Sequence, residues 1–367
     1  MPEPKVIISG GGTGGHVFPA IAIADAIREL HPQSEILFVG ANGKLEMEKV
    51  PEAGYKIIGL DISGLQRKLS LKNLSFPFKV IGSLLKARKI IKDFQPDIAV
   101  GVGGYASGPL LRMASFAGIP TLIQEQNSYP GITNKLLAPK AQRICVAYQN
   151  MNTFFPEEKI LLTGNPVRKN VWQIENKKDK ALQHFNLATG RKTILVIGGS
   201  LGARTINESI AQILSEISSS TDLQLIWQSG KAYAERAQEQ TKGLSNIYTS
   251  PFIKEMDLAY AAADIIISRA GAMSISELCL IGKPCILVPS PHVAEDHQTK
   301  NAMALVNSNA ALMVKDADAR LVLWPEIKKL LGDTSLRETL SGNIKKLGIG
   351  DADKRIARQV LEIISKK

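Results

Sequence analysis

The stretch SGGGTGGHVFPA, residues 9–20, joins the strand-length apolar run VII at residues 6–8 to IAIADAIREL, which has helical periodicity. Its five glycines let backbone N–H groups come close to an anion, and a helix beginning near Val17 would add the positive end of its dipole. The stretch therefore predicts a strand, a turn and a helix, with the turn facing phosphate or a reacting sugar. His16 is not explained by a turn that merely packs helix on strand.

A dinucleotide-binding turn is the first alternative, because Gly10, Gly12 and Gly15 fit the pattern G-x-G-x-x-G. That function also needs an acidic residue about 20 positions later, at the end of the second strand, to bind ribose hydroxyls. The expected second strand, Ile36–Val39, runs into Gly-Ala-Asn, and no carboxylate follows before Glu46. A nicotinamide cofactor is therefore disfavoured.

The composition sets wider limits. The chain has 367 residues, 44% of them apolar and 22% charged, which fits two globular domains. No apolar run approaches the roughly 20 residues of a membrane span, and no opening signal peptide is evident, so we expect folding in the cytosol. The three cysteines lack zinc-ligand spacing and are expected to be buried thiols. A net charge of +11 indicates an anionic partner, which could be nucleic acid, nucleotide phosphate or a membrane surface.

Apolar runs alternate with helical patterns along the whole chain, which predicts an α/β fold with parallel sheets. Strands are expected at residues 6–9, 36–39, 98–102, 121–123, 144–146, 193–197, 223–227, 265–268, 285–288 and 311–314. The pattern restarts at TILVIGGSLGARTINESIAQIL, so two Rossmann-like domains are predicted, with a hinge near residues 164–166. The first would span residues 1–165 and be joined by the C-terminal helix 352–367; the second would span 166–351. Ligands bind beyond the carboxyl ends of such strands, so the two glycine turns would face each other across a cleft.

The second glycine turn, residues 198–202, also spells G-x-S-x-G, the nucleophile elbow of α/β-hydrolases. A triad with Ser200 would need an acid and then a histidine downstream, and Asp264 with His292 or His297 could supply them. A turn after the first strand of a second Rossmann unit is the wrong place for an elbow. A phosphate cradle that includes Ser200 is the better interpretation.

A third group of polar residues lies between Ser268 and Ala302. A helix is expected after Arg269-Ala-Gly, with free N–H groups at its start and Glu277 one turn inside, where a carboxylate can accept from both hydroxyls of a ribose. The segment after the next strand holds polar side chains suited to sugar hydroxyls: Asp296, His297, Gln298 and Asn301. Both sets would lie at strand ends.

These motifs together resemble the MurG family of GT-B glycosyltransferases over nearly the full chain. The motifs that carry the resemblance are GGGTGGHVFPA, GVGGYASGP (residues 101–109), EQN (125–127), GNPVR (164–168), GGSLGA (198–203), SRAGAMSISEL (268–278) and DHQTKNA (296–302). The family passes N-acetylglucosamine (GlcNAc) from UDP-GlcNAc to the muramoyl 4-hydroxyl of lipid I, a lipid-linked muramoyl-pentapeptide, giving lipid II for peptidoglycan. The resemblance implies this activity, a GT-B fold, and a peripheral location on the cytoplasmic face of the bacterial plasma membrane.

The resemblance also implies roles for individual residues. Donor contacts are implied for Thr13, Gly14, Gly15, Asn127, Arg168, Ser200, Ile253 (through its backbone at the uracil edge), Ala272, Met273, Ser274, Ile275, Ser276, Glu277 and Gln298; Tyr105 would lie on the acceptor side. Two flanking positions depart from the family pattern, which often has His where Gln124 stands and Gln where His297 stands. They put acceptor-side details in doubt and leave the donor site untouched.

An inverting single displacement needs a base at the acceptor hydroxyl and stabilisation of the departing diphosphate. His16 is the first candidate for the base and Glu125 the second. Helix N-termini at the glycine turns can take the diphosphate charge, so no cofactor is required and a divalent cation would at most stimulate. The D-x-D pairs Asp316–Asp318 and Asp351–Asp353 could bind a metal, but they precede helical stretches and are better explained as N-caps.

The stretch between Ile62 and Lys92 carries eight basic residues and no acid: Arg67, Lys68, Lys72, Lys79, Lys86, Arg88, Lys89 and Lys92. Interleaved apolar residues include Leu74, Phe76, Phe78 and Ile81. Part of this must be ordinary core and solvated helix face. Without stacking aromatics or a groove-reading motif, nucleic acid is disfavoured, and an anionic phospholipid surface is the expected partner. The remaining alternatives for the chain are a UDP-GlcNAc epimerase, a glycolipid synthase and the Ser200 hydrolase.

Overall fold

The computed structural model describes residues 3–62, 76–199 and 202–366. The chain divides into two compact units, an N-terminal unit of Met1–Val167 with Asp351–Lys367 and a C-terminal unit of Arg168–Gly350. The boundaries expected from sequence lay at residues 165/166 and 351/352. The last part of the chain thus returns to the unit that contains the first.

The N-terminal unit is built on a parallel sheet that has seven strands in the described part of the chain, in the order β3-β2-β1-β4-β5-β6-β7. The strands are β1 (Lys5–Ser9), β2 (Glu35–Ala41), β3 (Lys56–Leu60), β4 (Ile98–Gly101), β5 (Thr121–Glu125), β6 (Arg143–Val146) and β7 (Ile160–Leu162). In the centre, Ile8 lies opposite Phe38 on one side and Val100 on the other. The chain reverses its direction of travel across the sheet between β1 and β4, which is where Rossmann-type sheets bind ligands.

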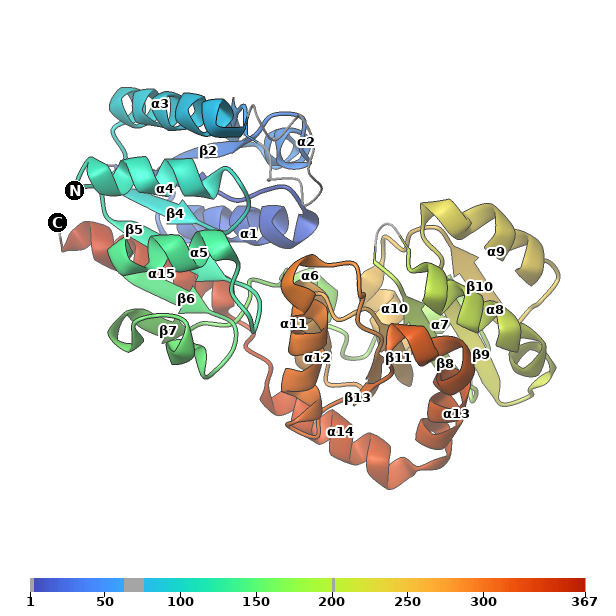
Figure 1. Cartoon of the computed structure of the whole chain (residues 1–367). Helices are drawn as coiled ribbons and strands as arrows, with labels where there is room; N and C mark the ends of the chain where they lie inside the picture. The colour runs from blue at the N-terminus through green and yellow to red at the C-terminus, as the bar shows by residue number, and fades with distance from the viewer. Residues whose placement is uncertain (1–2, 63–75, 200–201, 367) are drawn as a thin grey trace. The chain divides into compact units, whose positions relative to one another are not determined.

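Helices cover both faces of this sheet (Figure 1). They are α1 (Gly14–Leu30), α2 (Glu46–Glu52), α3 (Phe76–Phe94), α4 (Ser107–Phe116), α5 (Ile132–Leu137) and α15 (Ala352–Ser365). α1, α2 and α15 pack on one face, and α3, α4 and α5 on the other. The final helix, α15, lies beside α1 and buries Ile356, Ala357 and Val360 completely (Figure 1).

The C-terminal unit repeats the same topology. Its sheet has six parallel strands among the described residues, in the order β10-β9-β8-β11-β12-β13. The strands are β8 (Lys192–Ile197), β9 (Leu223–Gln228), β10 (Ile247–Ser250), β11 (Ile265–Ser268), β12 (Cys285–Leu287) and β13 (Leu312–Met313). The switch of direction now lies between β8 and β11. The predicted restart of the pattern at residue 193 is confirmed, as are two α/β domains with parallel sheets.

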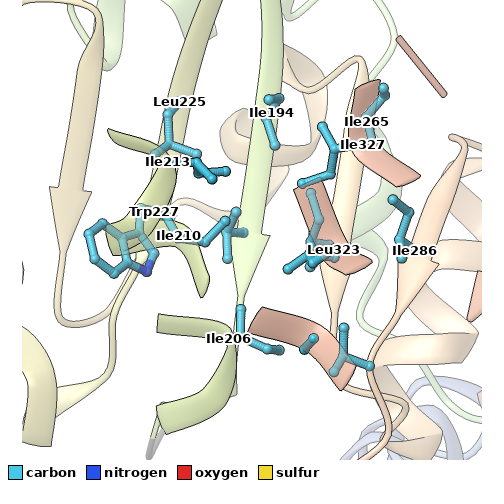
Figure 2. Packing of buried hydrophobic residues seen from close by; sticks show 14 of the residues in the cluster. Ile194, Ile206, Ile210, Ile213, Leu225, Trp227, Ile265, Ile286, Leu323 and Ile327 are labelled. Carbon is cyan, nitrogen blue, oxygen red and sulfur yellow. The ribbon is translucent and has the colours of Figure 1, made fainter. Parts of the chain in front are cut away.

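The helices of this unit again form two layers around a packed core. They are α6 (Lys169–Trp172), α7 (Lys178–His184), α8 (Arg204–Ser219), α9 (Ala234–Thr241), α10 (Met256–Ala262), α11 (Ala272–Ile281), α12 (His297–Val306), α13 (Ala319–Gly332) and α14 (Thr334–Lys346). Figure 2 shows side chains of α8 and α13 gathered against the strands: Ile206, Ile210, Ile213, Leu323 and Ile327. Trp227 is fully buried there, and its indole N–H donates to Asn207 Oδ1 at 3.0 Å.

Three strands were missed by the sequence prediction: β3, β7 and β10. All three are edge strands of their sheets. The sequences of β3 (KIIGL) and β10 (IYTS) include glycine or polar residues, and β7 (ILL) has only three residues, so none of them forms the long apolar run of a central strand. β7 has only partly buried residues, and β10 has one buried residue in four.

The state of the cysteines and the character of the helices can be compared with the sequence analysis. Cys145, Cys279 and Cys285 are free and buried, as predicted, and burial raises the pKa of the Cys145 thiol to about 12. Among the described residues, none of the helices combines the length and the apolar character that crossing a bilayer requires.

The packing of α15 into the N-terminal core gives a stability prediction. Ile356→Ala should lower the free energy of unfolding by about 2–5 kcal/mol, because it leaves a cavity against α1. Arg358→Ala, at an exposed position of the same helix, should change it by less than about 0.5 kcal/mol. Urea denaturation followed by circular dichroism measures both. Equal effects of the two changes would mean that α15 is not part of the folded core.

Candidate active site

The loops after β1 and β4 are tied together at the switch point of the N-terminal sheet. The N–H of Gly11 donates to Gly103 O at 3.3 Å, and the Ser107 hydroxyl donates to Ser9 O at 3.0 Å and to Gly103 O at 2.8 Å. The buried Gln126 side chain donates to Val102 O at 2.7 Å from the end of β5. The glycine turn is therefore braced by backbone and side-chain hydrogen bonds from two neighbouring strand ends.

His16 is half-buried in the first turn of α1. Its Nδ1 lies 3.1 Å from Gly11 O and 3.4 Å from the Thr13 hydroxyl oxygen. A carbonyl oxygen only accepts, so the contact with Gly11 requires the hydrogen on Nδ1. Gly103, with φ +92°, packs against the ring, and a Cβ there would lie 2.8 Å from Nε2. The loop after β4 thus needs a glycine to accommodate the imidazole.

The other residues predicted on this turn lie at the start of α1. Thr13 occupies the N-cap position without a side-chain capping bond, and Gly14 and Gly15 are the first helical residues. The first N–H groups of a helix have no acceptor within the helix, so they can donate to a ligand. Tyr105, predicted on the acceptor side, is 51% exposed in the loop after β4.

Glu125 ends β5 with its side chain buried. Its Oε1 accepts from the backbone N–H of Asn127 at 3.0 Å and from the Asn127 amide at 3.2 Å, and its Oε2 accepts from the N–H of Gly131 at 3.2 Å and the Asn134 amide at 2.8 Å. Burial raises the pKa of the Glu125 carboxyl, against the opposing effect of these hydrogen bonds. The carboxylate therefore holds the segment that carries Asn127, which is half-buried.

Gln124, one of the two departures from the family pattern, lies in a buried network. Its amide donates to Asn165 Oδ1 at 2.9 Å, and Asn165 donates to Gln126 O at 3.0 Å. Gln126 also donates to the Gln124 side chain. This network joins the end of β5 to the segment before the unit boundary.

In the C-terminal unit, Ser200 lies outside the described residues, but the turn around it can be followed at Gly199. The Gln228 amide donates to Gly199 O at 3.2 Å, and Gln228 Oε1 accepts from the N–H of Ile253 at 3.1 Å. Ile253 is buried, and its backbone N–H is held by the Gln228 side chain. Sequence reasoning missed Gln228, which the sequence shows only as a polar residue directly after the expected strand 223–227.

The predicted run Ala272 to Glu277 forms the first turns of α11. Ile275 is buried, whereas the other members are half-buried. Glu277 Oε2 accepts from the Tyr260 hydroxyl at 2.8 Å. Burial raises the pKa of the Glu277 carboxyl, while the Tyr260 hydrogen bond and the charge of Arg168 lower it. Arg168 is itself exposed at the start of α6.

Gln298 and Asp316 are two further polar residues that follow strands of the C-terminal sheet. Gln298 is half-buried, and its Oε1 accepts from the N–H of Ser290 at 2.8 Å. Asp316 pairs with Arg269 at 2.5 Å and accepts from the Thr205 hydroxyl at 2.9 Å. Arg269 also donates to Val288 O at 2.9 Å. The Arg269–Asp316 pair therefore links the first turn of α8 to the segments that follow β11 and β12.

The D-x-D pairs differ in detail from the expected N-caps. Asp318 and Asp351 do stand at N-cap positions, but neither side chain makes a capping hydrogen bond. Asp351 pairs instead with Arg355 at 2.7 Å. Within the described ranges, no group of three or more His, Cys, Asp and Glu side chains is arranged to hold a metal ion.

Two models of known protein domains match the chain. The Glycosyltransferase family 28 N-terminal domain matches residues 6–146, and the Glycosyltransferase family 28 C-terminal domain matches residues 193–356. The chain belongs to glycosyltransferase family 28. Its two units correspond to the two domains of that family, and its classification as a hexosyltransferase follows.

Relatives that align over nearly the full chain show which member of family 28 this protein resembles. The UDP-N-acetylglucosamine–N-acetylmuramyl-(pentapeptide) pyrophosphoryl-undecaprenol N-acetylglucosamine transferase of Bacteroides fragilis is 55% identical over 362 residues, 98% of this chain and 95% of the relative. The enzyme of the same name from Flavobacterium psychrophilum is 51% identical over 364 residues, 99% of each chain. The predicted MurG family is confirmed.

Solved structures agree. The crystal structure of Acinetobacter baumannii MurG has a TM-score of 0.78 and 27% identity, and the alignment covers 98% of this chain and 100% of that one. A UDP-N-acetylglucosamine 2-epimerase has a TM-score of 0.66 at 14% identity, over 100% of this chain and 98% of that one. At that identity the epimerase shows a similar fold alone.

The environment of Glu125 gives a test of its role. Glu125→Gln places an amide N–H₂ against N–H donors, so the free energy of unfolding should fall by about 1–3 kcal/mol. Glu157→Gln, at an exposed position of the same unit, is the control. Urea denaturation measures both. Unchanged stability with a turnover loss of roughly 10²–10⁴ would instead identify Glu125 as the catalytic base.

Proposed function

We propose that this chain transfers GlcNAc from UDP-GlcNAc to the muramoyl 4-hydroxyl of lipid I, giving lipid II for peptidoglycan. The observation that carries the proposal is the 55% identity, over 98% of the chain, to a relative named for this transfer. The polar strand-end residues of both units would supply the groups that such a reaction needs. The residue roles that follow are part of the proposal.

The C-terminal unit would bind the donor nucleotide. Glu277 is suited to the ribose hydroxyls, because a carboxylate can accept several hydrogen bonds. One of them comes from the Tyr260 hydroxyl, which leaves acceptor positions for the ribose. The Ile253 backbone would meet the uracil edge, and Ser200 with the N-terminus of α11 would contact the diphosphate. Arg168 adds a positive charge near Glu277. With these groups in place we propose that no cofactor is required and that a divalent cation at most stimulates.

The N-terminal unit would supply the base. The muramoyl 4-oxygen attacks the anomeric carbon, the bond from that carbon to the diphosphate oxygen breaks, and UDP leaves with the electron pair. The hydroxyl proton passes to a base, for which we propose His16, because its hydrogen-bearing Nδ1 leaves Nε2 as the basic nitrogen. Glu125 is the weaker candidate, since its two oxygens already accept four hydrogen bonds.

We also propose that α3 and α4 contact an anionic phospholipid surface. The inward face of α3 is core, with Ala87, Ile90 and Ile91 buried. Its outward face exposes further apolar side chains, and α4 packs beside it: Phe78 is 77%, Ile81 55%, Leu85 62% and Phe116 71% exposed. Exposed basic residues lie between them, including Lys79, Lys86, Arg88 and Lys89. The earlier candidates Lys72 and Leu74 fall outside the described residues, and the proposal does not require nucleic acid.

The activity is tested by incubating the chain with radiolabelled UDP-GlcNAc and a lipid I analogue. Labelled disaccharide-lipid is the expected product. Label released as free GlcNAc, or converted to an epimeric UDP-sugar without the lipid, would contradict the proposal and would favour a hydrolase or an epimerase.

Glu277→Ala should weaken UDP binding by about 1–3 kcal/mol, the cost of unpairing hydroxyls from a charged acceptor. Isothermal titration calorimetry measures the affinity, with Glu239→Ala, exposed on α9, as the control. An unchanged affinity for UDP would remove Glu277 from the donor site.

His16→Ala should lower kcat by roughly 10²–10⁴ while the UDP affinity is nearly kept, because it removes a proton acceptor. Steady-state kinetics and titration with UDP separate the two quantities. A loss confined to donor affinity would make His16 a binding residue.

Charge reversal tests the membrane surface. Lys79→Glu with Lys86→Glu should reduce binding to anionic vesicles by about tenfold or more, since each lysine near such a surface contributes about 1 kcal/mol. Lys328→Glu with Lys329→Glu, exposed on α13, changes the net charge equally and is the control. Vesicle sedimentation measures binding, and equal losses in the two variants would mean that only net charge matters.

A further inference from the structure

A buried carboxylate lies directly beneath the glycine turn. Glu46, the first residue of α2, is completely buried, and its Oε2 accepts from the N–H of Gly12 at 2.8 Å. Its Oε1 accepts from the N–H of Ala41, at the end of β2, at 2.9 Å. In the part of the chain that the structure describes, no basic side chain forms an ion pair with it. Two backbone N–H groups therefore stabilise this carboxylate.

The surrounding backbone leaves room for this side chain and for little else. A Cβ at Gly11 would lie 2.1 Å from Glu46 Oε1, and a Cβ at Gly40 would lie 2.5 Å from Glu46 Cγ. Both distances are far below van der Waals contact, so any larger residue at either position would displace the carboxylate. Two of the glycines at these strand ends are thus accounted for by the side chain that they accommodate.

The peptide group between Gly11 and Gly12 makes hydrogen bonds to both Glu46 and His16. The N–H of Gly12 donates to Glu46, and the carbonyl of the same peptide, that of Gly11, accepts from His16 Nδ1 at 3.1 Å. In a trans peptide these two groups point in opposite directions, so one peptide connects the carboxylate to the imidazole. The order is carboxylate, peptide, imidazole.

We propose that Glu46 is a positioning residue that acts on His16 through the Gly11–Gly12 peptide. A carboxylate at the N–H polarises the amide and makes its carbonyl a stronger acceptor, because connected hydrogen bonds reinforce one another. The carbonyl then holds the hydrogen on Nδ1 and keeps Nε2 as the basic nitrogen. In acid–base triads a carboxylate orients histidine directly in the same way; here a peptide group lies between them.

The contact between Glu46 and Gly12 also limits which N–H groups of the glycine turn can bind a ligand. The Gly12 N–H is occupied by a carboxylate, so it does not donate to a phosphate. The expectation that this turn faces phosphate or a reacting sugar therefore does not extend to the Gly12 N–H, whose part is to orient the base. The effect on turnover rests on the proposed function, in which His16 is the base, but the effect on the imidazole tautomer does not.

The tautomer is measured by NMR on protein labelled with ¹⁵N-histidine. The chain has five histidines, and the His16→Ala spectrum assigns the His16 signals by their absence. We expect neutral His16 in the wild-type protein to carry its hydrogen on Nδ1, and Glu46→Gln to shift it toward the Nε2–H form. Hydrogen on Nε2 in the wild type, or an unchanged tautomer in Glu46→Gln, would overturn the proposal. If Glu46→Gln fails to fold, the tautomer of His16 in the wild-type protein alone tests the proposal.

Kinetics provide the second measurement. Glu46→Gln should lower kcat by about 10–100-fold, the size of effect that follows when the residue orienting a metal-bound histidine is removed, while KM for UDP-GlcNAc stays unchanged. Glu52→Gln, exposed on the same helix, is the matched control and should leave both unchanged. In a His16→Ala background the effect of Glu46→Gln on kcat should disappear.

The double variant separates positioning from general support of the fold. If Glu46→Gln lowers kcat equally with and without His16, Glu46 does not act through the imidazole, and the proposal is wrong. If His16→Ala itself retains full turnover, the proposed base is wrong, while the tautomer measurement still tests the link between Glu46 and His16.

Discussion

Parallel pairing of all strands within each sheet is the constraint on which the candidate site depends. It brings the carboxyl ends of neighbouring strands to one edge, and the reversal between β1 and β4, and again between β8 and β11, parts the flanking loops there. Except for Glu125, which is the last residue of β5, every predicted site residue in the described part of the chain lies in a segment that follows a strand. The backbone groups of these segments are no longer in a strand ladder, so they need other partners.

Buried polar side chains supply those partners. Glu46 and Glu125 accept from backbone N–H groups, and Gln126, Gln228 and Arg269 donate to backbone carbonyls. An unpaired backbone group in such a place would cost about 1–3 kcal/mol, so these contacts fix the loop conformations. The two buried acids of the N-terminal unit thus shape the backbone, and His16 is left as the group suited to proton transfer.

The sequence was sufficient for the central strands and for the glycine turns. Runs such as Ile265–Ile267 are fully buried and form continuous apolar segments, whereas the edge strands β3 and β10 include glycine or polar residues and the edge strand β7 has only three residues. Glu46 could be seen in the sequence only as the first acid after the second strand. Its contact with Gly12 spans 34 positions and depends on how α2 packs, which no local pattern reports. Gln228 was hidden for the same reason.

The proposed transfer depends most on a direct attack by the acceptor hydroxyl on the anomeric carbon, with a base of the protein taking the proton. The anomeric configuration of the product, determined by NMR of the disaccharide released from the lipid, tests that step. UDP-GlcNAc carries an α linkage, so a single displacement predicts a β-linked GlcNAc. An α-linked product would contradict the account, because retention requires a second displacement or a different mechanism.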